Sequence, residues 1–285
     1  MPSPQPSLFH MHLVSDATGE TLSAIARAAA VQYPNVRPIE HMHSLVRTQR
    51  QLKRVLTEIE KEPGIVLYTV VNKTLGAELE QHCLHLKVPC LAVLRPIMQI
   101  FESYLGAPHM PTVAGQHVLD ADYFRRIDAM NFTLAHDDGR LPEDLSKADI
   151  VILGISRTSK TPTSIYLAQR GYKTTNLPLV PLVPLPQTLS QPHTAFVVCL
   201  IASAERVAEV RRNRAALLAD RDLESYVARD AITEEIAYTR KIAAANAWPI
   251  IDVTRRSIEE TATMIIKLLQ DRNAGVKPES ELSNG

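Results

Sequence analysis

The sequence predicts an α/β protein with two domains, each built around a mainly parallel sheet. Short runs of apolar and β-branched residues alternate with longer segments in which apolar residues recur at helical spacing. Such alternation with short connections is typical of βαβ units. A Gly-, Pro- and His-rich stretch over residues 106–115 interrupts the pattern, which restarts near residue 148. A chain of 285 residues is long enough for two modest domains.

The first domain is expected over residues 1–145, after a Pro- and Ser-rich lead-in. Its helix over 45–61 places Leu52, Val55, Leu56 and Ile59 on one face. A further helix is expected through Leu75, Leu79 and Leu86. The other predicted helices cover 21–33 and 120–134, and the predicted strands cover 9–14, 36–42, 65–71 and 90–94.

The second domain is expected over residues 146–272, with a flexible tail over 273–285. The strands are predicted at 149–153, 172–176, 196–201 and 248–253, and the helices at 163–170, 204–218, 225–245 and 257–269. Between them, residues 177–192 carry five prolines. We expect this segment to be extended and exposed, as a functional loop or lid.

Composition excludes several classes of protein. Lys plus Arg and Asp plus Glu are both 31, so the formal net charge is zero, which argues against a protein that coats nucleic acid or an anionic membrane. Three cysteines without close spacing support neither a disulfide framework nor a zinc motif. No apolar run is long enough for a membrane span and no signal peptide is visible, so we expect a cytoplasmic protein.

One loop carries the sharpest chemical signal. It lies between an apolar strand and a helix, and it approaches the phosphate-loop pattern G-x-x-x-x-G-K-[ST]. Its residues are Gly154, Ile155, Ser156, Arg157, Thr158, Ser159, Lys160 and Thr161. Loop N–H groups and the helix N-terminus can bind phosphate oxygens, Lys160 can reach a terminal phosphate, and the Thr161 hydroxyl can bind Mg²⁺.

The loop departs from that pattern at Ser159, where the pattern has a glycine that tolerates positive φ. Pro162 directly after Thr161 is unusual but acceptable in the first turn of a helix. The alternative interpretation is a Ser/Thr-rich turn whose side chains only cap the helix.

Three carboxylates are candidate catalytic groups. Asp137 and Asp138 follow His136 in a polar turn, and adjacent carboxylates can take a hydroxyl proton or hold a metal ion. Asp16 follows the first strand, at the end where α/β sheets bind ligands, although the local sequence favours a helix cap there.

Other polar groups have simpler interpretations. The pairs His10/His12 and His41/His43 each lie on one face of a strand, but no third ligand is spaced to complete a metal site, so we interpret them as core or surface histidines. Cys83 fits a buried structural thiol. An arginine cluster on the helix over 204–218 fits a solvated face, or less simply a contact with phosphates. Its members are Arg206, Arg211, Arg212 and Arg214.

Four long strings make the chain resemble the pyruvate, phosphate dikinase regulatory protein family of bifunctional kinase/pyrophosphorylases. They are HLVSDATGET (12–21), DADYFRRIDAMNFTLAHDDG (120–139), GISRTSKTPTSIYLAQRGYKTTNLPLVPLVPLP (154–186) and WPIIDVTRRSIEETA (248–262). The resemblance runs from about residue 9 to 269. Related regulators of phosphoenolpyruvate synthase carry Cys-Gly where this chain has Thr158 and Ser159, which favours the dikinase branch.

The resemblance implies a P-loop kinase-like second domain that phosphorylates a dikinase threonine with ADP as donor and inactivates the dikinase. It also implies removal of that phosphate by inorganic phosphate, with pyrophosphate as product. The family's nucleotide-binding loop falls on Gly154 through Thr161, with Lys160 and Thr161 in the phosphate-loop roles. A homodimer is expected. Phosphoryl transfer needs phosphates to be positioned and their charge spread, by Lys160, loop amides and Mg²⁺, and it needs a carboxylate for the threonine proton. Asp137 or Asp138 is the first candidate for this carboxylate, and Asp16 is the second. The alternatives are the same reactions on phosphoenolpyruvate synthase, or a nucleotide-sensing protein without catalysis.

Overall fold

The computed structural model describes residues 7–108, 121–181, 183–218 and 228–275. It divides into two compact units, Met1–Val118 and Leu119–Gly285. The division falls earlier than the expected boundary near residue 145, because helix α5 (Ala121–Ala135) packs on helix α6 (Lys160–Gln169) of the second unit. The Thr133 hydroxyl also accepts a hydrogen bond from the Thr174 N–H at 3.0 Å.

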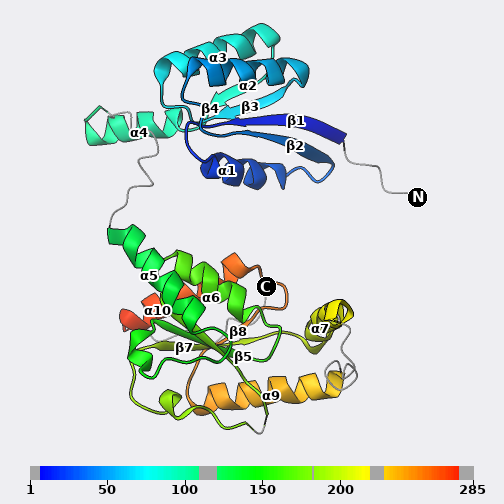
Figure 1. The fold of residues 1–285 in the computed structure, drawn as a ribbon, viewed down its shortest axis with the longest axis vertical. Helices are drawn as coiled ribbons and strands as arrows, with labels where there is room; N and C mark the ends of the chain where they lie inside the picture. The colour runs from blue at the N-terminus through cyan, green and yellow to red at the C-terminus, as the bar shows by residue number, and fades with distance from the viewer. Residues whose placement is uncertain (1–6, 109–120, 182, 219–227, 276–285) are drawn as a thin grey trace. The chain divides into compact units, whose positions relative to one another are not determined.

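Unit 1 contains a four-stranded parallel sheet with the order β2-β1-β3-β4 (Figure 1). The strands are β1 (Ser7–Val14), β2 (Val36–His43), β3 (Gly64–Tyr68) and β4 (Cys90–Ala92). The helices are α1 (Glu20–Ala30), α2 (Gln49–Lys61), α3 (Lys73–Leu86) and α4 (Arg95–Leu105). Helix α4 was not predicted from the sequence; it ends at Leu105, directly before the Gly-, Pro- and His-rich stretch that was expected to interrupt the pattern.

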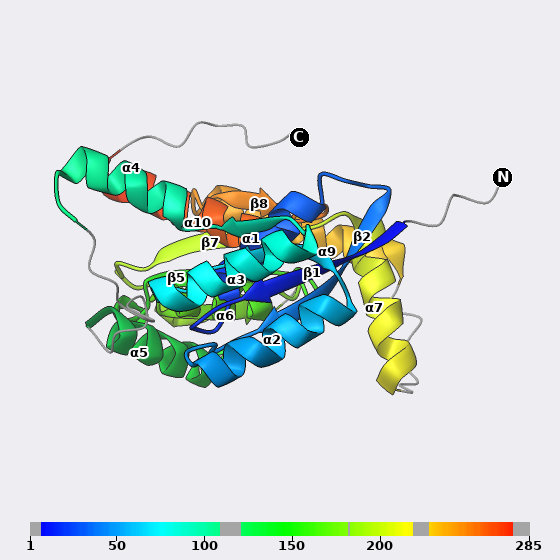
Figure 2. The same cartoon turned by 90° about the horizontal axis from the view of Figure 1, so that it is seen from above.

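Helices cover both faces of this sheet. Leu22 and Ala26 of α1 pack with Met11 and Leu13 of β1 on one face. Helices α2 and α3 lie side by side on the other face (Figures 1 and 2), where their apolar residues pack against Val14, Val66 and Tyr68. The capping box of Thr48 and Gln51 sets the start of α2, since each satisfies a backbone N–H of the other. Cys83 is fully buried in this core, which confirms its structural interpretation.

Unit 2 repeats the same strand order, β6-β5-β7-β8, again all parallel. The strands are β5 (Ile150–Gly154), β6 (Thr174–Pro178), β7 (Phe196–Ile201) and β8 (Ile250–Asp252). Besides α5 and α6, its helices are α7 (Ala204–Leu218), α9 (Arg229–Ala245) and α10 (Ile258–Asn273). Each of the four predicted strands is present, and the two-domain parallel α/β architecture is confirmed. Helix α10 extends beyond its predicted end at residue 269 and ends at Asn273, where the predicted tail begins; residues 276–285 of that tail lie outside the described part.

The two faces of the second sheet are covered by different helices. Leu167 of α6 and Ala262, Ile265 and Leu269 of α10 pack on the side chains of Ile150, Ile152 and Val198. Helix α9 lies on the opposite face (Figure 1), where Ala243 packs with Val151, Leu153 and Cys199. Because both faces are buried, β5 and β7 are apolar at every position.

The proline-rich segment is less exposed than the sequence predicted. Its first residues complete β6, and Leu179 and Leu189 are buried in the same core as α9. A short 3₁₀ turn, Gln187–Leu189, brings the second of these leucines inward. Val180 and Val183 are about half exposed, at 50% and 55%. The segment is therefore partly core, through these two leucines, while residues 180, 183–184, 187 and 190–192 are exposed as predicted.

No helix within the described ranges combines the length and the apolar composition that crossing a bilayer requires.

Candidate functional site

The predicted phosphate loop connects the carboxyl end of β5 to the first turn of α6. Strand β5 ends at Gly154 and α6 begins at Lys160. After β5, the chain adds β6 on one side of this strand and then β7 on its other side, so β5 lies at the topological switch point of the sheet. In open α/β sheets, the crevice outside the carboxyl ends at such a point is where ligands bind.

Backbone conformation explains why the loop has its particular residues. Gly154 has φ 153°, and a Cβ atom there would lie 2.4 Å from the Leu200 carbonyl oxygen, so only glycine fits. Ser159 has φ 58°, the left-handed conformation that the phosphate-loop pattern gives to glycine. A non-glycine residue pays about 1–2 kcal/mol for it. Ser159 is the N-cap residue of α6, but its side chain forms no hydrogen bond with the first N–H groups of that helix.

Lys160 is buried, with 7% of its surface exposed, and its Nζ atom donates a hydrogen bond to the Ile155 carbonyl oxygen at 2.8 Å. The Thr158 hydroxyl donates to the same oxygen at 2.9 Å, which closes the loop on itself. Burial lowers the pKa of Lys160 to about 8, and the positive charges of Arg157 and Arg211 act in the same direction. A cation that is buried near two further cations is stabilised by an anion, so this end of the loop suits a phosphate group.

Thr161 and Asp137 come together at the start of α6. The Thr161 hydroxyl donates to Asp137 Oδ1 at 3.0 Å. Asn176 of β6, which is fully buried, donates from Nδ2 to the same oxygen. The main chain of the turn is also fixed, since the Gly139 N–H donates to the Asn176 carbonyl oxygen at 2.9 Å. These hydrogen bonds hold the polar turn 136–140 beside the candidate phosphate loop. Its carboxylates must lie there if they are to act in catalysis.

Asp138 takes a different position from its neighbour. Its backbone is left-handed with φ 52°, and its side chain is exposed. Among the charges near Lys160, that of Asp138 acts most strongly on the lysine pKa, and it raises it. The Asp137 carboxylate is therefore bound by Thr161 and Asn176, whereas the Asp138 carboxylate is exposed and close enough to Lys160 to influence its ionisation.

The third candidate carboxylate, Asp16, lies in unit 1. It follows β1, and its Oδ2 atom accepts a hydrogen bond from the Val71 N–H at 2.8 Å after β3. Its backbone carbonyl oxygen accepts from Arg47 Nε at 2.7 Å. With 4% of its surface exposed, Asp16 links the carboxyl ends of two strands. Its contacts are those of a structural acceptor, although it does not cap α1: the N-cap there is Gly19.

Two residues of this site were missed or misjudged from the sequence. Asn176 was treated only as the end of a strand, and an asparagine in an otherwise buried strand was the available signal. Arg211 was interpreted as part of a solvated face, but it is buried and pairs with Glu235 of α9 through two hydrogen bonds, of 3.0 and 2.6 Å. Arg206, which pairs with Glu209 on an exposed face, fits the original interpretation. The side chain of Arg214 lies outside the described part.

The fold is that of a parallel α/β protein, and its candidate loop combines a glycine at the strand end, a buried lysine and a helix N-terminus with adjoining carboxylates. Comparison with known proteins makes this specific. The chain belongs to the Kinase/pyrophosphorylase family, whose model matches residues 11–266. It is thus a member of a phosphotransferase family.

Similar proteins match the chain over almost its full length. One from Chelativorans sp. (strain BNC1) is 55% identical over 268 residues, covering 94% of this chain and 98% of the relative. One from Brucella anthropi is 54% identical, covering 94% and 97%. One from Bradyrhizobium diazoefficiens is 54% identical, covering 93% and 95%. All three are named "Putative pyruvate, phosphate dikinase regulatory protein".

Proposed function

We propose that this protein regulates pyruvate, phosphate dikinase as a bifunctional serine/threonine kinase and pyrophosphorylase. The names of its relatives indicate the partner, and family membership indicates the two reactions. The observation that carries the proposal is the buried Lys160 in a phosphate loop, with Asp137 and Asp138 beside it. ADP is the proposed donor and inorganic phosphate the proposed acceptor in the reverse direction.

Both reactions balance with these groups. In the kinase direction, the threonine oxygen bonds to the β-phosphorus of ADP while the bond to the bridging oxygen breaks, which gives phosphothreonine and AMP. In the other direction, an oxygen of inorganic phosphate attacks the phosphothreonine phosphorus, and threonine and pyrophosphate are formed. Lys160 and the loop N–H groups neutralise the phosphoryl oxygens, whose charge must be stabilised in either direction.

The two carboxylates are assigned different tasks. Asp138 is exposed beside Lys160, so it takes the threonine proton in the kinase direction and returns it in the reverse one. Asp137 holds Thr161 through Oδ1. Asp16 keeps a structural role in unit 1.

Thr161 and Asp137 are also suitable ligands for Mg²⁺. Their oxygen atoms are 3.0 Å apart. Octahedral Mg²⁺ with bonds of 2.0–2.1 Å brings adjacent ligand atoms to about 2.9 Å, and it prefers oxygen donors. When bound there, the ion would offset charge on the phosphates. Cytoplasmic location and a homodimer remain predictions; light scattering on the purified protein tests the second.

The test is phosphoryl transfer with ADP labelled at the β-phosphate and purified dikinase. We expect label on a dikinase threonine with ADP and none with ATP labelled at the γ-phosphate, and release of pyrophosphate when inorganic phosphate is added. Labelling of phosphoenolpyruvate synthase instead would move the chain to the synthase branch. ADP binding without transfer to either target would leave the nucleotide-sensing alternative.

Substitutions then test the roles. Lys160→Ala should abolish transfer, while Lys147→Ala, an exposed lysine in the same unit, should not. Asp138→Asn should reduce the kinase rate by at least about 100-fold, as expected for loss of general base catalysis. Asp16→Asn should leave the chemical step intact if the protein remains folded. Full activity of all three Asp→Asn variants, Asp137→Asn included, would contradict this site.

A further inference from the structure

The four histidines of unit 1 form a continuous stack across two neighbouring strands. The rings of His10 and His12 on β1 stack with those of His41 and His43 on β2, with centroids 4.6–5.4 Å apart and planes within 24° of each other. The strands are parallel, and His12 is aligned with His41 in the register. The alternate spacing in the sequence correctly placed each pair on one face. The sequence offered no third ligand at a suitable spacing, but the fold brings a distant carboxylate to these histidines.

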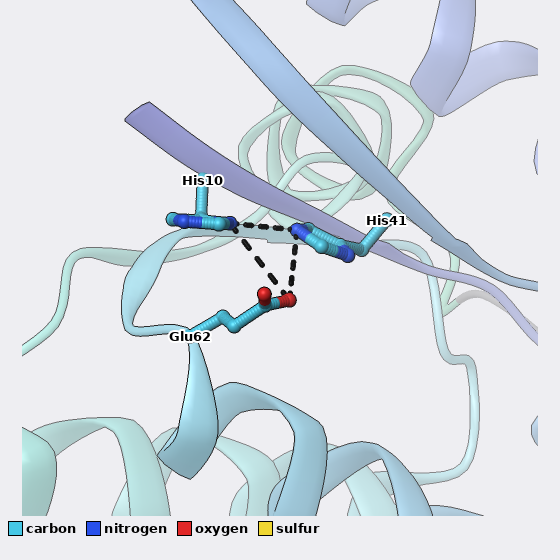
Figure 3. Close-up of side chains that lie close together, drawn as sticks. All are labelled: His10, His41 and Glu62. Carbon is cyan, nitrogen blue, oxygen red and sulfur yellow. Dashed lines mark hydrogen bonds and ion pairs between the residues drawn. The ribbon is translucent and has the colours of Figure 1, made fainter. Parts of the chain in front are cut away.

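The third group is Glu62, the C-cap residue that directly follows the last residue of α2. Figure 3 shows its carboxylate directed at the facing nitrogens of His10 and His41. The separations are 2.9 Å for His10 Nδ1 and His41 Nε2, 3.5 Å for His41 Nε2 and Glu62 Oε2, and 3.9 Å for His10 Nδ1 and Glu62 Oε2. One atom of each side chain takes part in all three separations, so these atoms lie at the corners of a triangle.

We propose that His10, His41 and Glu62 form a binding site for Zn²⁺ in unit 1. Tetrahedral Zn²⁺ with bonds of 2.0–2.2 Å brings its donor atoms to about 3.3–3.5 Å from one another. The three observed separations lie on both sides of that value, so shifts of about half an ångström convert the triangle into one face of a zinc tetrahedron. Two imidazoles and one carboxylate are ligands that favour Zn²⁺ over Mg²⁺.

The groups around the triangle hold its members in place. His12 is fully buried, and its Nε2 atom lies 2.8 Å from the carbonyl oxygen of Glu62, to which it must donate. His12 Nδ1 is then an acceptor for His43 Nε2, at 3.1 Å. Gly64 pairs with His10, and a Cβ atom on it would lie 2.0 Å from the His10 carbonyl oxygen, so glycine allows the connection carrying Glu62 to approach β1 this closely.

The site is accessible to an ion from solvent. The side chains of His10, His41 and Glu62 are 31%, 20% and 51% exposed. Without metal, one of the two facing histidine nitrogens donates to the other. Metal binding to both would require the donor ring to carry its proton on its other nitrogen instead. A bound ion would link the end of α2 to the paired strands β1 and β2, in addition to the histidine contacts, and would stabilise unit 1.

The experiment is titration of the metal-stripped, untagged full chain with ZnCl₂ in a calorimeter, together with absorption spectra of the Co²⁺-loaded protein. We expect one Zn²⁺ per chain with a dissociation constant of about 10 μM or tighter and a tetrahedral Co²⁺ spectrum. The thermal unfolding midpoint should rise with Zn²⁺ concentration. Mg²⁺ should produce none of these effects.

Matched variants locate the site. His41→Gln and Glu62→Gln should each weaken Zn²⁺ binding at least tenfold and remove the Co²⁺ spectrum. His82→Gln is the control, because His82 faces Glu60 at 3.0 Å in a pair with only two donors. Circular dichroism of the metal-free variants shows whether each is folded. Absence of saturable Zn²⁺ binding in the parent protein would overturn the proposal and leave a proton-sharing histidine pair. Equal binding by both site variants, or equal loss in His82→Gln, would also overturn it.

Discussion

Replacing Lys160 by methionine should make unit 2 more stable while removing its chemistry. The lysine is 7% exposed, and burial lowers its pKa from 10.5 to about 8. At about 1.4 kcal/mol for each pKa unit, the folded protein pays about 3 kcal/mol to keep this ammonium charged at pH 7. Methionine fills similar space without charge. The Ile155 carbonyl oxygen keeps its hydrogen bond from Thr158, so the substitution leaves no buried acceptor unpaired.

The pH dependence gives this prediction its sign. Between pH 8 and 10.5 the unfolded lysine holds more proton than the folded one, so the stability of the parent protein rises with pH across that window. The advantage of Lys160→Met should therefore be about 3 kcal/mol at or below pH 7 and should shrink toward zero near pH 10.5. Lys147→Met, at an exposed position, should show no such change.

Urea denaturation followed by tryptophan fluorescence measures this directly. The chain has one tryptophan, Trp248, which is partly buried and packs against the core of unit 2. The signal therefore reports the unit that contains the loop. A destabilised Lys160→Met protein at pH 7, or a gain that stays constant from pH 7 to pH 10, would refute the reasoning that burial depresses the lysine pKa.

Further predictions concern the same unit. ADP affinity should fall above pH 8, approaching tenfold per pH unit, because the phosphate needs a charged Lys160; isothermal titration calorimetry at several pH values from 7.5 upward measures it. Gly154→Ala should cost about 2–4 kcal/mol in urea denaturation, whereas Gly171→Ala, where the nearest contact is the flexible Arg125 side chain, should cost less. Glu235→Ala should cost about 3 kcal/mol, since it removes the bidentate partner of the buried Arg211. Val180→Ser with Val183→Ser should weaken dikinase binding without changing ADP affinity, a result that equal loss of both would contradict.

Local patterns predicted the strands and the loop well, because these depend on short-range features. The apolar run ending in Gly154, followed by Lys160 and Thr161, was sufficient to place a strand-to-helix loop between β5 and α6, and phosphate binding by that loop stays a prediction. The prediction that Ser159 must tolerate a positive φ is confirmed by its φ of 58°. Strand existence followed from periodicity, although bounds moved by a few residues, as at β3 and β6.

Features that depend on distant partners could not be predicted in the same way. Helix α5 belongs to unit 2 because of its packing on α6, which no local pattern reveals. Arg211 is buried because Glu235 on another helix compensates its charge, and Glu62 reaches the histidines only because α2 ends over β1. Leu179 and Leu189 enter the core although five prolines surround them, since prolines restrict the backbone but do not determine which side chains face inward.

The continuity of each sheet in the sequence affects how the protein folds while it is being synthesised. In the described part, each sheet draws all its strands from one continuous stretch of sequence, residues 7–92 and 150–252. Unit 1 thus has its complete sheet before any strand of unit 2 leaves the ribosome. At about 5–20 residues per second, synthesis of the rest takes several seconds or more, far longer than a small α/β domain needs to fold. We therefore expect vectorial folding, with each half reaching its native topology without waiting for the other.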